Sequence, residues 1–128
     1  MIIDVIEPLE NSELNKLRNE IRAFVTERDW EQFHTPKNLA CALSVEAAEL
    51  LEHFQWLRTG SKEELGAIKL EYVQHEIADV LVYLIRLADN LDIDLIEAVT
   101  KKMIINRKKY PVEMVRGDSR KYSEYKKE

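Results

Sequence analysis

Residues 43–51, LSVEAAELL, and residues 75–81, HEIADVL, decide the expected fold and site of this chain. Each stretch is largely apolar and holds two acidic residues three positions apart. A helix turns by about 100° per residue, so each pair projects from one helical face, and the apolar neighbours indicate that this face points inward. If the two helices pack antiparallel as neighbours, all four carboxylates converge on one patch. The four acids are Glu46, Glu49, Glu76 and Asp79.

Four amphipathic helices account for most of the chain, and no strand is expected. Thr35 before Pro36 is typical of a helix start, the Ser61–Glu64 pattern is a capping box, and Pro111 ends the last helix. Short connections favour antiparallel neighbours, so the predicted fold class is all-α, a four-helix bundle in one domain. The core covers residues 12–111, and a polar C-terminal tail, residues 112–128, is expected to be extended or mobile from Val115 onward. The predicted helical ranges are 12–28, 35–57, 61–90 and 94–109.

Composition places the chain among small cytosolic proteins. It has 128 residues, one cysteine (Cys41) and a net charge of −5. Residues 1–8 lack the basic start of a signal peptide, and the longest apolar run, residues 80–85, is too short to span a membrane. Residues 101–128 hold ten basic against four acidic residues, whereas the rest is strongly acidic and would repel duplex nucleic acid. We therefore expect no membrane or nucleic-acid partner and a cytoplasmic location.

Four converging carboxylates need either protons or cations. Two like charges 4 Å apart repel by about 4 kcal/mol at an effective dielectric constant of 20. Oxygen-only ligands favour a hard ion, first Mg²⁺ and then Mn²⁺, whereas a di-iron site would require Glu-x-x-His pairs. The alternative is that these acids line a solvated helix face.

A magnesium site near a basic segment indicates a phosphorylated substrate. No glycine-rich phosphate loop is present in the sequence, which excludes P-loop and Rossmann chemistry. Aromatic side chains could hold a base by stacking, although core packing is the alternative reading for each of them. The candidate phosphate ligands are Lys102, Asn106, Arg107 and Tyr110, and the candidate base ligands are Trp30, His34, Trp56 and Tyr83.

The acid pattern, Glu46-x-x-Glu49 and after 26 residues Glu76-x-x-Asp79, is similar to the signature of the MazG-type all-α nucleotide pyrophosphohydrolases. Within that superfamily, the chain most resembles the dCTP pyrophosphatases over about residues 14–125. The matching segments are 28–39 (RDWEQFHTPKNL), 54–56 (FQW), 79–84 (DVLVYL) and 102–111 (KMIINRKKYP).

This resemblance implies a homo-oligomer, a tetramer or a dimer, that hydrolyses a nucleoside triphosphate between its α- and β-phosphates. It implies that the four acids hold Mg²⁺, that Lys102 and its neighbours on that helix contact phosphates, and that Tyr83 lies under a deoxyribose. Trp30, His34 and Trp56 would form the base pocket. Animal relatives have a histidine where this chain has Ile21. If that histidine contributes to recognition of the base, selectivity for cytosine is lower here, so a broader NTP or dUTP pyrophosphohydrolase is the alternative. The alternative outside the enzymes is a non-catalytic helical oligomer that binds nucleotides.

Overall fold

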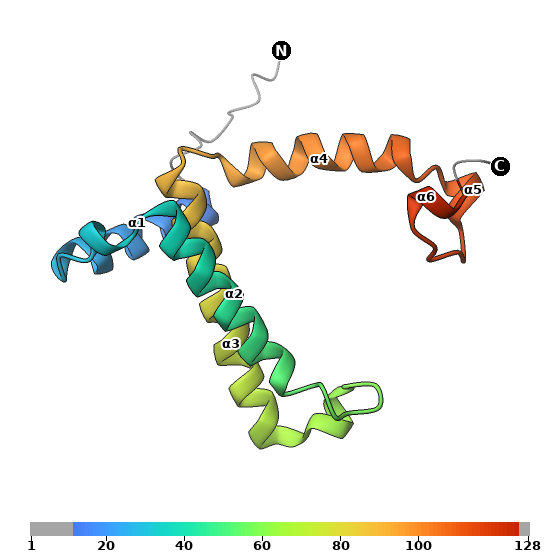
Figure 1. Cartoon of the computed structure of the whole chain (residues 1–128), viewed down its shortest axis with the longest axis horizontal. Helices are drawn as coiled ribbons and strands as arrows, with labels where there is room; N and C mark the ends of the chain where they lie inside the picture. Colours follow the sequence, from blue (N-terminus) through green and yellow to red (C-terminus); the bar gives the residue numbers. More distant parts are fainter. Residues whose placement is uncertain (1–11, 126–128) are drawn as a thin grey trace, which may run out of the picture. The chain divides into compact units, whose positions relative to one another are not determined.

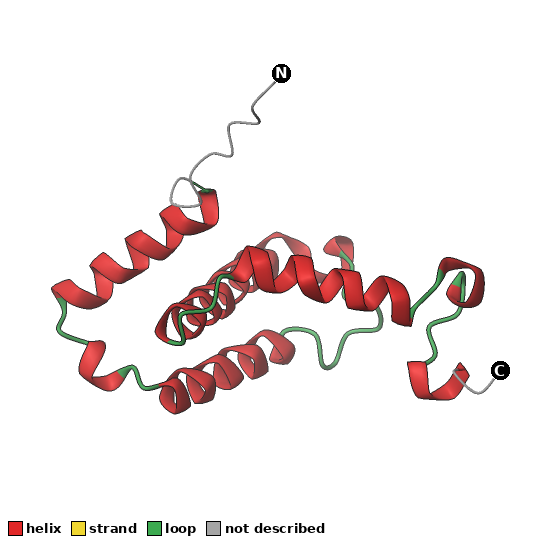
Figure 2. Cartoon of the chain, turned by 90° about the horizontal axis from the view of Figure 1, so that it is seen from above, coloured by secondary structure: helices red, strands yellow, loops and turns green. Residues whose placement is uncertain are grey.

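The structure is a computed structural model that describes residues 12–125. Residues 1–11 lie outside this range, and with them residues 1–8, on which the expectation about a signal peptide rests. The last three residues of the expected tail, 126–128, also lie outside it. Every element that the structure describes is helical, so the predicted all-α class is confirmed (Figure 2). None of the described helices is long and apolar enough to cross a bilayer.

The described residues divide into two compact units, with the boundary between Asp92 and Ile93. The first unit holds α1, a short 3-10 turn (η2), α2 and α3, and the second holds α4, α5 and α6 (Figure 1). Their bounds are Glu13–Glu27 for α1, Glu31–Phe33 for η2, Pro36–Glu52 for α2, Lys62–Asn90 for α3, Leu95–Lys109 for α4, Val112–Val115 for α5 and Tyr122–Tyr125 for α6.

Side-chain caps explain why the four long helices begin where the sequence predicts. In each helix the N-cap oxygen accepts a hydrogen bond from the backbone N–H three residues later, over 2.9–3.3 Å. Such caps satisfy donors that the first helical turn leaves unpaired. The capping residues are Ser12, Thr35, Ser61 and Asp94.

The loop between α2 and α3 is longer than expected, because α2 ends at Glu52 and not near residue 57. The Glu64 carboxylate folds the loop back by accepting hydrogen bonds from the backbone N–H groups of residues 58–60. The loop turns at Gly60, whose φ of 74° suits glycine, and a Cβ there would lie 2.6 Å from Phe54 Cδ1. These contacts hold residues 53–61 out of the helix.

The C-terminal segment also differs from the expectation of an extended tail. It forms two single-turn helices, α5 and α6, joined by a turn at Gly117. Pro111 is the N-cap of α5, and Asp118 accepts hydrogen bonds from the backbone and side chain of Arg120. Local hydrogen bonds therefore give this polar segment more structure than its composition indicates.

Helices α2 and α3 lie side by side and run antiparallel, as predicted (Figures 1 and 2). The His53 and Tyr72 rings stack with centroids 6.3 Å apart. One turn back along α2 and one turn forward along α3, Glu49 meets Glu76. Apolar side chains buried in this unit fix the register, with Leu39 only 1% exposed and Val25, Val73 and Ile85 each at 3%.

Candidate metal centre

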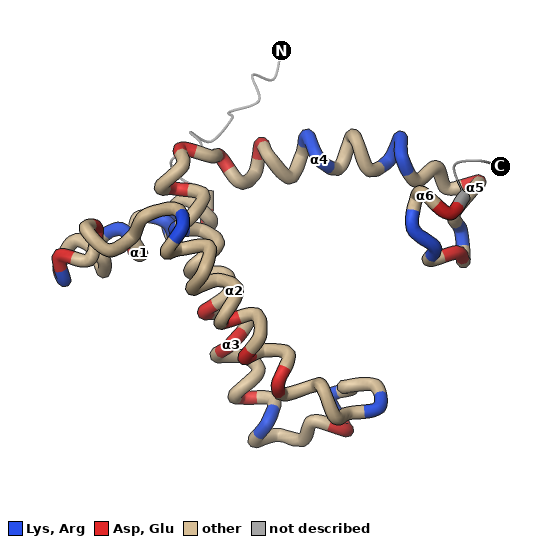
Figure 3. The backbone as a smooth tube through the Cα atoms, viewed as in Figure 1, with Lys and Arg blue, Asp and Glu red and all other residues tan. Residues whose placement is uncertain are grey.

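Three of the four predicted acids converge between α2 and α3. Oxygens of Glu46 and Glu49 on α2 and of Glu76 on α3 all lie within 4.8 Å of one another, and each side chain is half-buried. Figure 3 shows the acidic positions of the two helices facing each other midway along the pair. The spacing of three residues on one helix and the antiparallel neighbour produce this cluster, as the sequence predicts.

The electrostatics of this acid cluster favour a bound cation. Glu46 Oε2 and Glu76 Oε2 are buried and have no hydrogen-bond partner among the described residues. Burial raises the pKa of Glu46 to about 7, with further contributions from Glu49, Glu76 and Asp79. Unpaired, buried carboxylate oxygens from several residues form an all-oxygen donor set, which fits a hard divalent cation. The cluster could therefore bind such an ion.

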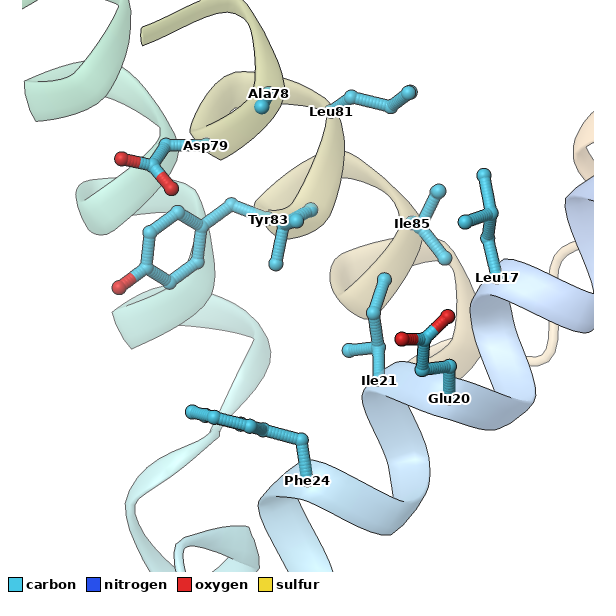
Figure 4. Close-up of a pocket in the computed structure, with 10 residues that line it drawn as sticks. Leu17, Glu20, Ile21, Phe24, Ala78, Asp79, Leu81, Tyr83 and Ile85 are labelled. Carbon is cyan, nitrogen blue, oxygen red and sulfur yellow. The ribbon is translucent and has the colours of Figure 1, made fainter. Parts of the chain in front are cut away.

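Asp79, the fourth predicted acid, lies at the edge of the cluster. It is more exposed than the three glutamates and contributes to the raised pKa of Glu46 through its charge. In Figure 4 its carboxylate and the Tyr83 ring, one turn later on α3, both lie on the α2 side of the helix. Asp79 therefore connects the acids to the adjacent pocket.

This pocket is a largely apolar cavity of about 510 Å³ between α1 and α3 (Figure 4). Asp79 and Tyr83 lie on one wall, and Ile21 and Phe24 of α1 lie on the other. An apolar, aromatic-lined pocket beside an acid cluster can hold a flat organic group whose charged end points at the acids. The other lining residues are Leu17, Glu20, Ala78, Leu81, Val82 and Ile85.

The predicted base ligands are only partly brought together. The Trp30 ring contacts Phe24 edge-on at 5.7 Å between centroids and lies 6.4 Å from the His34 ring. Trp56, in contrast, is 88% exposed in the loop at the other end of α2. A helix of 17 residues is about 25 Å long, so Trp56 and Trp30 of one chain do not share a pocket.

The predicted phosphate ligands all lie on α4 or at its C-cap in the second unit. Lys102 and Arg107 are exposed, and Asn106 is half-buried with its amide 3.8 Å from Met103 Sδ. Tyr110 lies beneath Lys109, whose ammonium is 5.7 Å from the ring centroid. Basic residues gather toward the end of this helix (Figure 3). Their role in the acid site remains a prediction.

Comparison with known proteins identifies the family. The MazG-like family model matches residues 41–125, a range that includes all four acids. The chain belongs to the MazG-like family. This match confirms the resemblance to the MazG-type family that the sequence indicated.

Named relatives of this MazG-like chain include mammalian enzymes. It is 46% identical over 113 residues to dCTP pyrophosphatase 1 of Homo sapiens, covering 87% of this chain and 66% of that protein. It is 42% identical over 118 residues to dCTP pyrophosphatase 1 of Bos taurus, covering 87% and 67%. The chain thus spans about two thirds of the length of these curated relatives.

A solved structure extends the similarity to an archaeon. The crystal structure of a pyrophosphatase from Archaeoglobus fulgidus superposes with a TM-score of 0.69 at 46% identity. The match covers 79% of this chain and 94% of that one.

Sequence reasoning missed a second polar cluster in this MazG-like chain, formed by Arg22, His34, Arg86 and Asp89. Arg22 of α1 donates to Asp89 of α3 through Nε at 2.6 Å and also through Nη2. Arg86 Nε donates to His34 Nδ1 at 3.1 Å. The available signal was Arg86 inside the otherwise apolar residues 80–88, with Asp89 directly after them, since a charged residue at such a position is paired when it is buried.

Proposed function

We propose that this MazG-like chain hydrolyses nucleoside triphosphates between the α- and β-phosphates, with dCTP as preferred substrate and dCMP and diphosphate as products. The names of the mammalian relatives and of the archaeal pyrophosphatase support this activity. The proposed cofactor is Mg²⁺, for which Mn²⁺ could substitute. A broader preference that includes dUTP is the second candidate, because apolar Ile21 lines the pocket wall where a base would lie.

The observation that carries this proposal is the convergence of three carboxylates, two of which, Glu46 and Glu76, each have a buried oxygen without a hydrogen-bond partner among the described residues. Glu46, Glu49, Glu76 and Asp79 would hold the cation. When bound, Mg²⁺ supplies charge neutralisation for the phosphates and lowers the pKa of a coordinated water.

The residues around the acids would bind and orient the rest of the nucleotide. The cavity that Tyr83 and Ile21 line is apolar and adjoins Asp79, so a nucleoside held there would have its phosphates directed at the acids. Trp30, which contacts Phe24, and His34, which contacts Trp30, would form one wall of the base site. The basic residues Lys102 and Arg107, with Asn106 and Tyr110, would neutralise or contact the phosphates.

We further propose a homo-oligomer in the cytoplasm, with a tetramer favoured and a dimer possible. Trp56 is too far from Trp30 within one chain to share its base pocket, so a second copy would have to bring it there. Large apolar side chains are also exposed, among them Leu51 at 61% and Ile77 at 54% on α2 and α3. Apolar surface of this kind is typical of protein contacts.

Product analysis tests the proposal. The chain is incubated with dCTP and Mg²⁺, with a parallel sample in excess EDTA, and the products are separated by ion-exchange chromatography. We expect equimolar dCMP and diphosphate with Mg²⁺ and no product with EDTA. Formation of dCDP and orthophosphate would contradict the proposed bond cleavage. Equal turnover of dCTP, dUTP and dATP would reject the narrow substrate preference.

A further inference from the structure

His34 joins the connector between α1 and α2 to helix α3 at two points. Arg86 Nε donates a hydrogen bond to the ring atom Nδ1 at 3.1 Å. Asn90, one turn later on α3, donates from Nδ2 to the backbone oxygen of His34 at 2.9 Å. Both the ring and the backbone of His34 are therefore fixed with respect to α3.

The Arg86 guanidinium is held in place by its own counter-charge. Arg86 is only 9% exposed, and its Nη1 lies 3.5 Å from Asp89 Oδ2. The hydrogen bond from Arg22, followed by the charges of the neighbouring arginines, lowers the pKa of Asp89 despite its burial. Asp89 therefore stays ionised and keeps Arg86 charged and oriented toward His34.

The direction of the Arg86–His34 hydrogen bond determines where the imidazole proton lies. A guanidinium has only N–H donors, so the ring nitrogen that faces it must offer a lone pair. A neutral imidazole has one N–H, which must then be on Nε2. Burial and the charge of Arg86 both lower the pKa of His34, which favours this neutral ring.

We propose that Arg86 is a positioning residue that holds His34 in the Nε2–H tautomer, so that the base site receives one N–H donor. The base-site part of this inference rests on the proposed function, whereas the tautomer follows from the hydrogen bond alone. His34 adjoins Trp30, Trp30 contacts Phe24, and Phe24 lines the α1–α3 pocket. The fitting ligand atom is an acceptor on a nucleobase, either a carbonyl oxygen or an unprotonated ring nitrogen.

The tautomer can be measured in the unmodified chain. We propose ¹⁵N NMR of the histidine rings, with His34 assigned among the three histidines by comparison with His34→Gln. We expect Nδ1 of His34 to show the shift of a nitrogen without a proton and Nε2 that of a protonated one. A proton on Nδ1 would overturn the proposal, and this measurement needs no activity and no destabilising variant.

Variants then test the role of Arg86. We expect Arg86→Met to give a mixture of the two tautomers and to raise KM for dCTP about tenfold, with kcat changed less than about twofold. Arg86→Lys should restore part of the tautomer preference, because an ammonium can also donate to Nδ1. The matched control is Arg116→Met, an exposed arginine of the second compact unit, outside the Asp89 cluster.

These outcomes separate the two proposals. An unchanged tautomer and an unchanged KM in a folded Arg86→Met chain would overturn the positioning role. If the unmodified chain releases no diphosphate from any nucleotide, the proposed function fails, while the spectrum of its His34 ring still decides the tautomer.

Discussion

Helix α3 passes through two polar clusters that are built in opposite ways. Around Glu76, three carboxylates approach within 4.8 Å, and two of their buried oxygens have no partner. Around Asp89, 13 residues and about 20 Å further along the helix, one carboxylate is bound by two arginines. The first cluster concentrates negative charge that is uncompensated, whereas in the second the carboxylate is compensated by two positive charges of the same chain.

This difference separates a binding site from a structural contact. A buried charge that is already paired has little to gain from an added ligand. Unpaired like charges, in contrast, repel one another in the ligand-free site. A cation that fits removes this repulsion and is attracted by every carboxylate, so its binding is electrostatically favourable. The comparison therefore predicts that changes at the acid cluster affect activity most and changes at the Asp89 cluster affect stability most.

The largest expected effect comes from removing a charge at the acid cluster. We expect Glu49→Gln and Glu76→Gln each to lower kcat for dCTP by about 10³-fold at saturating Mg²⁺, the scale seen when one group that stabilises transition-state charge is removed. The matched control is Glu52→Gln, an exposed acid on the same helix, which should stay within about twofold. Steady-state diphosphate release measures both. A rate near that of the unmodified chain in both cluster variants would contradict the site.

The next effect concerns the Asp89 cluster. Asp89→Asn leaves buried Arg86 without its carboxylate, so we expect the free energy of unfolding to fall by about 2 kcal/mol. Urea denaturation in EDTA measures this change. Glu97→Gln, which breaks the exposed Lys101–Glu97 pair on α4, should leave the free energy of unfolding almost unchanged. An equally small loss for Asp89→Asn would show that its two arginines contribute little.

The smallest effect is a pH dependence at Glu46. Its pKa is about 7 in the folded chain, above the ordinary value of 4.5 for this side chain, so the folded state binds the extra proton between these values. This stabilisation is complete below about pH 4.5 and is lost as pH rises through 7. In EDTA, the stability of Glu46→Gln relative to the unmodified chain should therefore rise by at least about 1 kcal/mol between pH 5 and pH 8.

Saturating Mg²⁺ provides the control for the Glu46 measurement. At pH 8 the bound ion should shift the stability difference in favour of the unmodified chain, because the variant has lost a charged ligand. Thermal unfolding with and without Mg²⁺ at both pH values tests this. The same stability difference at pH 5 and pH 8 in EDTA would contradict the raised pKa.

The sequence predicted the features that depend on short-range patterns. Helix starts followed from local caps such as Thr35 and Ser61, and the acid cluster followed from two pairs at a spacing of three residues. These signals lie within one or two helical turns, so they need no knowledge of the partner helix beyond its direction.

The features that sequence reasoning missed depend on distant residues. The end of α2 at Glu52 depends on a carboxylate twelve residues later, that of Glu64, which draws the loop back. The contact between His34 and Arg86 joins residues 52 positions apart. The helical pattern predicts that Arg86 lies in an apolar face. Its hydrogen-bond partner His34 cannot be predicted from that pattern, because the two residues meet only when the connector between α1 and α2 packs on α3.

The shared register of α2 and α3 has an evolutionary consequence. The His53–Tyr72 stack, the Glu49–Glu76 approach and the Asn90 contact to His34 all require the same alignment of the two helices. Inserting or deleting one residue within either helix would rotate everything beyond it by about 100° and separate these pairs. Differences in chain length between homologues should therefore accumulate in the hairpin of residues 53–61, where extra residues can loop out without disturbing either helix.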